Sequence, residues 1–295
     1  MAYIILAAFL WGITGTIAKF IYKTSINPFM LVEARLTFSF LILFLFLLFK
    51  NKNLLKIEKS DLIYFAILGM IGYSSSQFLY LYTISLTNVG IAVLLQSFSS
   101  ILAVLYSIIK KEPLDFKKIV AVFVSLIGIS LVIFGNGNLS FAINPLALLT
   151  GIGSAFFVCF NIIISQKLLI KYNAWTVITY GFGFGMLIWF ILLSPYKVFP
   201  PIFGDNKVLL SILYISVFST VIAFGLYTMG LKKVHPTTVT ILGTLEPVVA
   251  AIIAYIFLKE KLTLLQISGG ILVIIAIISL QYNKKNAKNH RNLKK

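Results

Sequence analysis

Long apolar stretches, separated by short polar connections, run through this chain of 295 residues. Most hold about twenty residues, the length that a helix needs to cross about 30 Å of hydrocarbon. The runs are continuous rather than alternating, which favours helices over the strands of a membrane barrel. The pattern predicts an all-α membrane protein with ten transmembrane helices, at 2–22, 28–49, 61–85, 89–109, 117–135, 145–166, 173–194, 208–230, 235–258 and 263–282.

The chain also contains an internal repeat. Tyr82-Thr83 recurs as Tyr227-Thr228 at an offset of 145 residues, and Lys111-Glu112 recurs as Lys259-Glu260 at an offset of 148. Each copy holds five predicted spans, and an odd number places the copies in the membrane in opposite orientations. Inverted repeats around a midplane site are typical of secondary transporters. We therefore expect two inverted five-helix units, at 1–136 and 144–282, and a basic cytoplasmic tail at 283–295.

Composition excludes a soluble domain. The chain is 60% hydrophobic and 11% charged, with a mean hydropathy of +1.01, so it has too little polar surface to fold in water. The single cysteine, Cys159, lies within a predicted span, which leaves no disulfide framework and no cysteine metal site. Its expected role is that of a small packing residue. A polytopic protein of the cell membrane, such as a bacterial inner membrane, is the class that remains.

The net charge of +17 does not indicate nucleic acid once the charges are assigned to loops. With the N-terminus inside, 18 of the 25 Lys and Arg residues lie on the cytoplasmic side and 5 on the other. This asymmetry follows the positive-inside rule and predicts that both termini are cytoplasmic. The basic tail either contacts anionic lipid head groups or is simply solvated.

Apart from residues at the very ends of the spans, four charged side chains fall within predicted spans, where an unpaired charge costs several kcal/mol and marks a candidate site. Lys19, Glu33 and Arg35 share the same third of the bilayer. They could form an ion-paired cluster at the outward mouth of a substrate path. Alternatively, Lys19 extends to the interface and Glu33 pairs locally.

The fourth, Glu246, lies near the midplane of span 9 and precedes Pro247. Proline frees a backbone carbonyl about one turn earlier and weakens the helix there. The carboxyl could bind a proton or a substrate amine, which makes Glu246 the proton-coupling candidate. Alternatively, it is a fixed brace that satisfies backbone groups at the kink.

Polar and aromatic side chains at similar depth are further candidates for substrate binding. Ser and Thr also serve as ordinary packing and hydrogen-bonding groups between membrane helices, so each has a structural alternative. These candidates are Trp11, Gln77, Tyr80, Tyr82, Gln96, Ser99, Asn161, Thr240 and Thr244.

Motifs for several other functions are missing from the sequence. It has no nucleotide-binding Gly-x-x-x-x-Gly-Lys-[Ser/Thr] loop, no His-Glu-x-x-His and no Gly-x-Ser-x-Gly. We therefore predict no catalytic residues, no metal and no cofactor.

Several short motifs, taken together, resemble the EamA family of the drug/metabolite transporter superfamily. They are Trp11-Gly12, Pro28 with Arg35, Glu246-Pro247, and Lys259-Glu260 leading into Gly269-Gly270. The resemblance covers nearly the whole chain and implies a ten-helix transporter, usually an exporter of metabolites or amino acids, with a central cavity between its halves. Two departures from the family pattern, Ser99-Ser100 in place of a proline and Tyr180 at the position repeating Arg35, argue against two halves that share site residues equally.

Two classes of function compete at this point. The favoured one is a secondary transporter of a small organic solute, moving it outward by alternating access. The other is a membrane protein that transports nothing, such as an intramembrane enzyme or an assembly subunit. A flippase-like carrier of a lipid-linked substrate is a narrower third possibility. The partners expected are the solute and the lipid bilayer, without nucleic acid, and the sequence leaves monomer and homodimer open.

Overall fold

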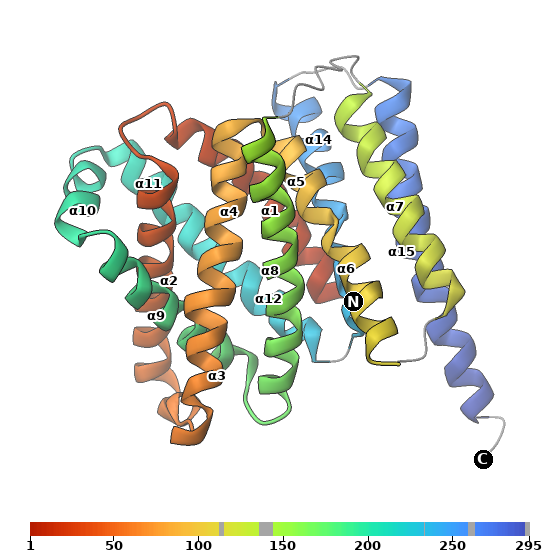
Figure 1. Ribbon diagram of the computed structural model, residues 1–295, viewed down its shortest axis with the longest axis horizontal. Coiled ribbons are helices and arrows are strands. Elements are labelled where there is room, and N and C mark those ends of the chain that lie inside the picture. Colours follow the sequence, from red (N-terminus) through yellow and green to blue (C-terminus); the bar gives the residue numbers. More distant parts are fainter. Residues whose placement is uncertain (112–114, 136–143, 233, 259–262, 293–295) are drawn as a thin grey trace.

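The computed structural model describes residues 1–111, 115–135, 144–232, 234–258 and 263–292, and throughout them the chain forms helices and no strands (Figure 1). The helices are α1 (Ala2–Ile21), α2 (Pro28–Lys50), η1 (Lys52–Leu55), η2 (Lys59–Asp61), α3 (Leu62–Ala66), η3 (Ile67–Tyr73), α4 (Ser74–Leu86), α5 (Val89–Ser97), α6 (Ser99–Ile109), α7 (Phe116–Phe134), α8 (Pro145–Leu169), α9 (Ala174–Leu192), α10 (Pro195–Phe203), α11 (Asn206–Tyr214), η4 (Ile215–Ile222), α12 (Ala223–Leu231), α13 (Pro236–Gly243), α14 (Leu245–Leu258) and α15 (Leu264–Asn292).

Within the described ranges, nine helical segments are long and apolar enough to cross a membrane. They correspond to the first nine predicted spans. The tenth predicted span falls in α15, whose apolar part, Leu264–Ser279, is shorter. Large apolar side chains such as Leu149 and Ile191 are 70% and 76% exposed, as expected for a surface that faces lipid rather than water.

Asparagine and proline set where helices begin. Three spans begin with a proline, at Pro28, Pro145 and Pro236, within one residue of the predicted starts at 28, 145 and 235. The Asn27 side chain accepts a hydrogen bond from the Met30 amide at 3.0 Å, which satisfies one of the amides left free at a helix N-terminus. The connection between the two predicted repeats, at 136–143, and the Lys259-Glu260 pair lie outside the described residues.

Two spans are interrupted near their centres. The fourth breaks at Phe98, between α5 and α6, and the ninth breaks at Thr244, between α13 and α14. Pro247 explains the second break, because it has no N–H to donate to the carbonyl four residues earlier. The first break contains no proline, and the sequence did not predict it.

Two further spans contain a wide π-helical segment, η3 in the third and η4 in the eighth. In each case a side-chain hydroxyl donates a hydrogen bond to a backbone carbonyl of the π-helical segment. Ser74 donates to the Gly69 carbonyl and Thr220 donates to the Ile215 carbonyl, both at 2.9 Å. Segments of this kind are rare and are frequently found at functional sites.

The helices of the two sequence halves interleave. The first helix, α1, packs against α12 and α14, and α8 packs against α4 and α5. The second long helix of each half packs against a π-helical segment of the other half: α2 contacts η4, and α9 contacts η3. At the edge of the bundle, α7 and α15 run side by side (Figure 1) and approach closely where Gly128 faces Gly269.

Polar contacts fasten the connection between α2 and α3 to the start of α9. Lys171 forms ion pairs with Glu58 and Asp61, Tyr172 donates to Asp61 at 2.5 Å, and Thr176 donates to the Leu54 carbonyl at 2.7 Å. Hydrogen bonds to Asp61 and Glu58 raise the pKa of Lys171 above its ordinary value. Lys171 therefore stays charged across the physiological range.

The structure differs from the sequence prediction at two places. A short helix, α10, lies where only a loop between the seventh and eighth spans was expected. Its Val198 and Ile202, one turn apart, are fully buried, but nine residues are too few to register as a span. At the C-terminus, α15 continues to Asn292, beyond the expected end at 282.

The crossing of η3 and α9 provides a test of the packing. In Gly69→Ala the added methyl would overlap the Gly181 carbonyl oxygen, and such overpacking costs about 1–3 kcal/mol. We expect a lower midpoint of thermal unfolding for the purified protein in detergent. Gly243→Ala is the matched control, because no atom lies within 4 Å of its added methyl. Equal midpoints of thermal unfolding for the two variants would show that η3 and α9 do not pack closely at Gly69.

Candidate functional site

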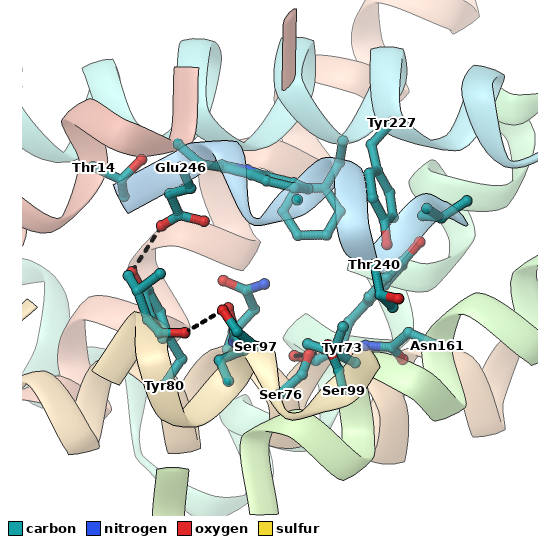
Figure 2. Close-up of a pocket in the computed structure, with 18 of the residues that line it drawn as sticks. Thr14, Tyr73, Ser76, Tyr80, Ser97, Ser99, Asn161, Tyr227, Thr240 and Glu246 are labelled. Atoms are coloured by element: carbon teal, nitrogen blue, oxygen red, sulfur yellow. Dashed lines mark hydrogen bonds between the residues drawn. The ribbon is translucent and has the colours of Figure 1, made fainter. Parts of the chain in front are cut away.

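A cavity of about 100 Å³ lies at the centre of the bundle, where the interrupted helices meet (Figure 2). This is several times the space that one buried water needs. Helices from both halves of the sequence form its wall. The lining residues are Trp11, Thr14, Arg35, Tyr73, Ser76, Gln77, Tyr80, Val93, Gln96, Ser97, Ser99, Val158, Asn161, Ser165, Phe224, Tyr227, Val239, Thr240, Gly243 and Glu246.

The two helix breaks contribute directly to this wall. Ser97 and Ser99 flank the first break, and Gly243 precedes the second. Backbone carbonyls near the breaks accept hydrogen bonds from nearby hydroxyls, from Ser100 to Ser97 at 2.7 Å and from Thr244 to Ile241 at 2.6 Å. Because these hydroxyls supply local partners, an irregular backbone is tolerated in the middle of a membrane.

Glu246 lies on the wall with Tyr80, which reaches it from α4. The Tyr80 hydroxyl donates to Glu246 Oε1 at 3.0 Å (Figure 2), and both residues are at most 9% exposed. The carboxyl sits in the first turn of α14, where the helix dipole favours negative charge. This hydrogen bond leaves further acceptor capacity on the carboxyl for a ligand or a proton.

Arg35 reaches the cavity from α2 and is only 2% exposed. Its Nε donates to Thr220 Oγ1 at 2.6 Å and its Nη2 donates to the Ser219 carbonyl at 3.2 Å. The same carbonyl accepts from Trp11 Nε1 at 2.9 Å. The π-helical segment η4 therefore anchors both α1 and α2, and the guanidinium retains donors that neither contact uses.

Aromatic rings and carboxamides complete the wall. The Trp11 ring centroid lies 5.1 Å from those of Phe224 and Tyr227, which makes one side of the cavity apolar. Asn161 donates to Ser76 Oγ at 2.9 Å. The cavity thus offers a guanidinium, a carboxyl group, amide groups and an aromatic wall to a small molecule.

Nine of the thirteen candidates named from the sequence line this cavity, namely Trp11, Arg35, Gln77, Tyr80, Gln96, Ser99, Asn161, Thr240 and Glu246. The other four lie elsewhere. Lys19 is bonded to the Thr87 carbonyl at 3.2 Å at an exposed position, and Tyr82 stacks on Phe78. Thr244 is buried at the helix break and Glu33 is buried away from the wall.

The predicted cluster of Lys19, Glu33 and Arg35 does not form, because no ion pair joins these three side chains in the structure. The reason is helical geometry. Residues two apart in a helix point about 200° apart, so Arg35 faces the cavity and Glu33 faces away. Similar depth along the sequence did not mean a shared face.

Eleven of the twenty lining residues are not among the candidates named from the sequence, and five of these show which signal, if any, was available. Thr14 lies three residues after Trp11, Ser165 lies four after Asn161, and Tyr73 lies four before Gln77. The spacing of neighbours on one helix face would have found all three. The other two, Phe224 and Tyr227, follow no candidate on their own helix.

Comparison with known proteins identifies the chain. A model of the EamA-like transporter family matches residues 1–134 and 145–281. A Salmonella typhimurium protein described as the uncharacterized inner membrane transporter YicL is 27% identical over 290 residues, covering 97% of this chain and 96% of its own. An uncharacterized transporter of Clostridium kluyveri is 26% identical over 248 residues, covering 78% and 76%.

A solved crystal structure superposes with a TM-score of 0.77 over 97% of both chains, at 16% identity. At that identity it supports the fold alone. The names of the family and of these relatives indicate transporters rather than enzymes. The chain therefore belongs to the EamA-like transporter family, within the drug/metabolite transporter superfamily, and is a multi-pass membrane transporter of the bacterial inner membrane.

Proposed function

We propose that this protein is a secondary transporter that exports a small organic metabolite, an amino acid or a similar solute, by alternating access through the central cavity. The observation that carries the proposal is the cavity itself. It is enclosed by helices of both halves, lies where two spans are interrupted, and contains Arg35 and Glu246 on its wall. Interrupted helices around a midplane site are typical of secondary transporters.

The proposed architecture is ten membrane helices in two inverted repeats, at 1–136 and 144–282. Irregular features that recur at matching places support it. The π-helical segments begin at Ile67 and Ile215, 148 residues apart, and the breaks at Phe98 and Thr244 are 146 apart. These offsets lie close to those of the sequence repeat.

Roles for the wall residues follow from their chemistry. The Arg35 guanidinium offers its remaining donors to a carboxylate or another anionic group of the solute. Glu246 accepts a solute amine or a proton. Trp11, Phe224 and Tyr227 pack against an apolar part, and Gln77, Gln96, Ser99, Asn161, Thr240 and Tyr80 provide polar contacts.

The proposed orientation places both termini in the cytoplasm, on the basis of the asymmetry of basic residues. Reporter fusions after Lys295 and within residues 136–144 should then report opposite sides of the membrane. Two reporters on the same side would contradict the ten-span arrangement.

The export proposal is tested with Arg35→Ala. Metabolite profiling of the medium should first reveal a solute enriched by cells that overproduce the protein, relative to an empty control. Loss of a charged hydrogen bond to that solute, about 1.5–3 kcal/mol, should reduce its export about tenfold or more. Lys19→Ala is the control and should export normally, because that amine is exposed and lies outside the cavity wall. Normal export by Arg35→Ala, with equal amounts of protein in the membrane, would show that Arg35 does not bind the solute.

Proton coupling at Glu246 is tested with Glu246→Gln. The amide keeps the shape and can still accept from Tyr80, but it cannot release a proton. We expect loss of transport driven by a pH gradient while exchange of solute across the membrane continues. Tyr80→Phe is the control, since it removes the hydrogen bond and leaves the carboxyl. If the Glu246→Gln protein keeps both the rate and the pH dependence of transport, the carboxyl only stabilises the helix at the Pro247 kink.

A further inference from the structure

A second carboxyl is buried in the bundle, away from the central cavity. Glu33 of α2 is 0% exposed and is not part of the cavity wall. Both of its carboxyl oxygens lack a hydrogen-bond partner. The function proposed above does not use this group.

Contacts of its neighbours place Glu33 on the side of α2 that meets α9. On a helix, Glu33 lies about 40° around from Phe29 and about 60° from Leu36. The ring centroids of Phe29 and Trp189 lie 6.1 Å apart, and Leu36 packs on Gly185. Both partners belong to α9, so Glu33 lies in the contact between the two helices.

An aromatic cover closes this contact at the end where α2 begins. It consists of Phe29 from α2, Phe78 from α4 and Trp189 from α9. The ring centroid of Phe78 lies 4.6 Å from that of Phe29 and 5.3 Å from that of Trp189. Phe29 is 42% exposed, whereas Glu33, one turn deeper, is fully enclosed. The cover therefore separates the carboxyl from the membrane surface.

Within the part of the chain that the structure describes, no charged group on the helices around Glu33 forms an ion pair with it. Arg35, on the same helix, faces η4 and bonds Thr220 and Ser219. The tyrosines of the packed helices are engaged elsewhere or exposed: Tyr80 of α4 donates to Glu246, Tyr82 stacks on Phe78, Tyr180 of α9 donates to the Leu55 carbonyl, Tyr214 of α11 stacks on Phe218, and Tyr196 of α10 is exposed. The lysines of the same elements, Lys50 of α2, Lys52 of η1, Lys197 of α10 and Lys207 of α11, are all exposed.

A carboxylate without donors in such surroundings is costly, and the usual outcome is a neutral group. The Trp189 indole N–H and the Thr37 hydroxyl, one turn beyond Glu33 on α2, are likewise buried and unpartnered. These donors lie on the same two helices and are not engaged in this conformation.

We propose that Glu33 is a proton-binding site, neutral in this conformation and closed off by the aromatic cover. When the cover opens, the O–H bond breaks, its electrons remain on the carboxylate and the proton passes to water. Trp189 and Thr37 are then available to stabilise the anion. The site is distinct from Glu246 and requires no solute, so its test is independent of whether the export proposal holds.

The test is infrared spectroscopy of the full chain in lipid vesicles at neutral pH. Glu33→Gln, which imitates the neutral acid and should fold normally, is expected to remove a carbonyl stretch of a protonated carboxylic acid. Glu58→Gln, at an exposed carboxylate paired with Lys171, should leave that region unchanged. Glu246→Gln separates any contribution of the cavity carboxyl. If the acid band that remains in the Glu246→Gln protein persists when Glu33→Gln is added, the proposal is overturned.

Transfer to heavy water tests the cover. The Glu33 band shifts when its proton exchanges for deuterium, and Phe29→Ala should accelerate this shift. Phe49→Ala makes the same change at the other end of α2, where the ring is 84% exposed, and should not. Equal exchange rates in the two variants would show that the aromatic cover does not enclose the site.

Discussion

The need to pair every backbone amide and carbonyl in a medium without water governs this structure. Regular helices meet that need alone, so most of the perimeter is regular. Irregular backbone occurs at the breaks and π-helical segments, and there side chains take over. Hydroxyls of Ser74, Ser100, Thr220 and Thr244 each donate to a carbonyl at these places. The same irregularity brings polar groups to the centre of the bundle.

Three ionisable side chains are buried in the bundle, and the structure accommodates each of them differently. Arg35 is bound to a backbone carbonyl and a hydroxyl, Glu246 receives a phenolic hydrogen bond, and Glu33 has no partner at all. None is joined to another by an ion pair within the described part of the chain. A permanent pair inside the cavity would compete with a solute for both charges, whereas separated groups stay available to it.

Hydropathy and helix-start signals were enough to locate nine of the ten predicted spans and to name nine of the twenty residues on the cavity wall. They could not predict which side of a helix faces inward, since Glu33 and Arg35 differ by two residues and face opposite ways. Proline at position 247 indicated the break at Thr244, but nothing comparable marks Phe98. The sequence did not predict α10, because a short helix that covers its neighbours has no hydropathy signal of its own. Rotation about the helix axis, and not depth, was the missing information.

The carbonyl of Ser219 holds α1 and α2 together through Trp11 and Arg35. Its own hydroxyl has no partner. The acceptor at this junction therefore belongs to the main chain, which no codon change can delete, while both donors are side chains. A saturation library should for this reason tolerate several small residues at position 219 and few at 11 or 35. The most constrained atom of the junction would thus be invisible in a profile of sequence variation.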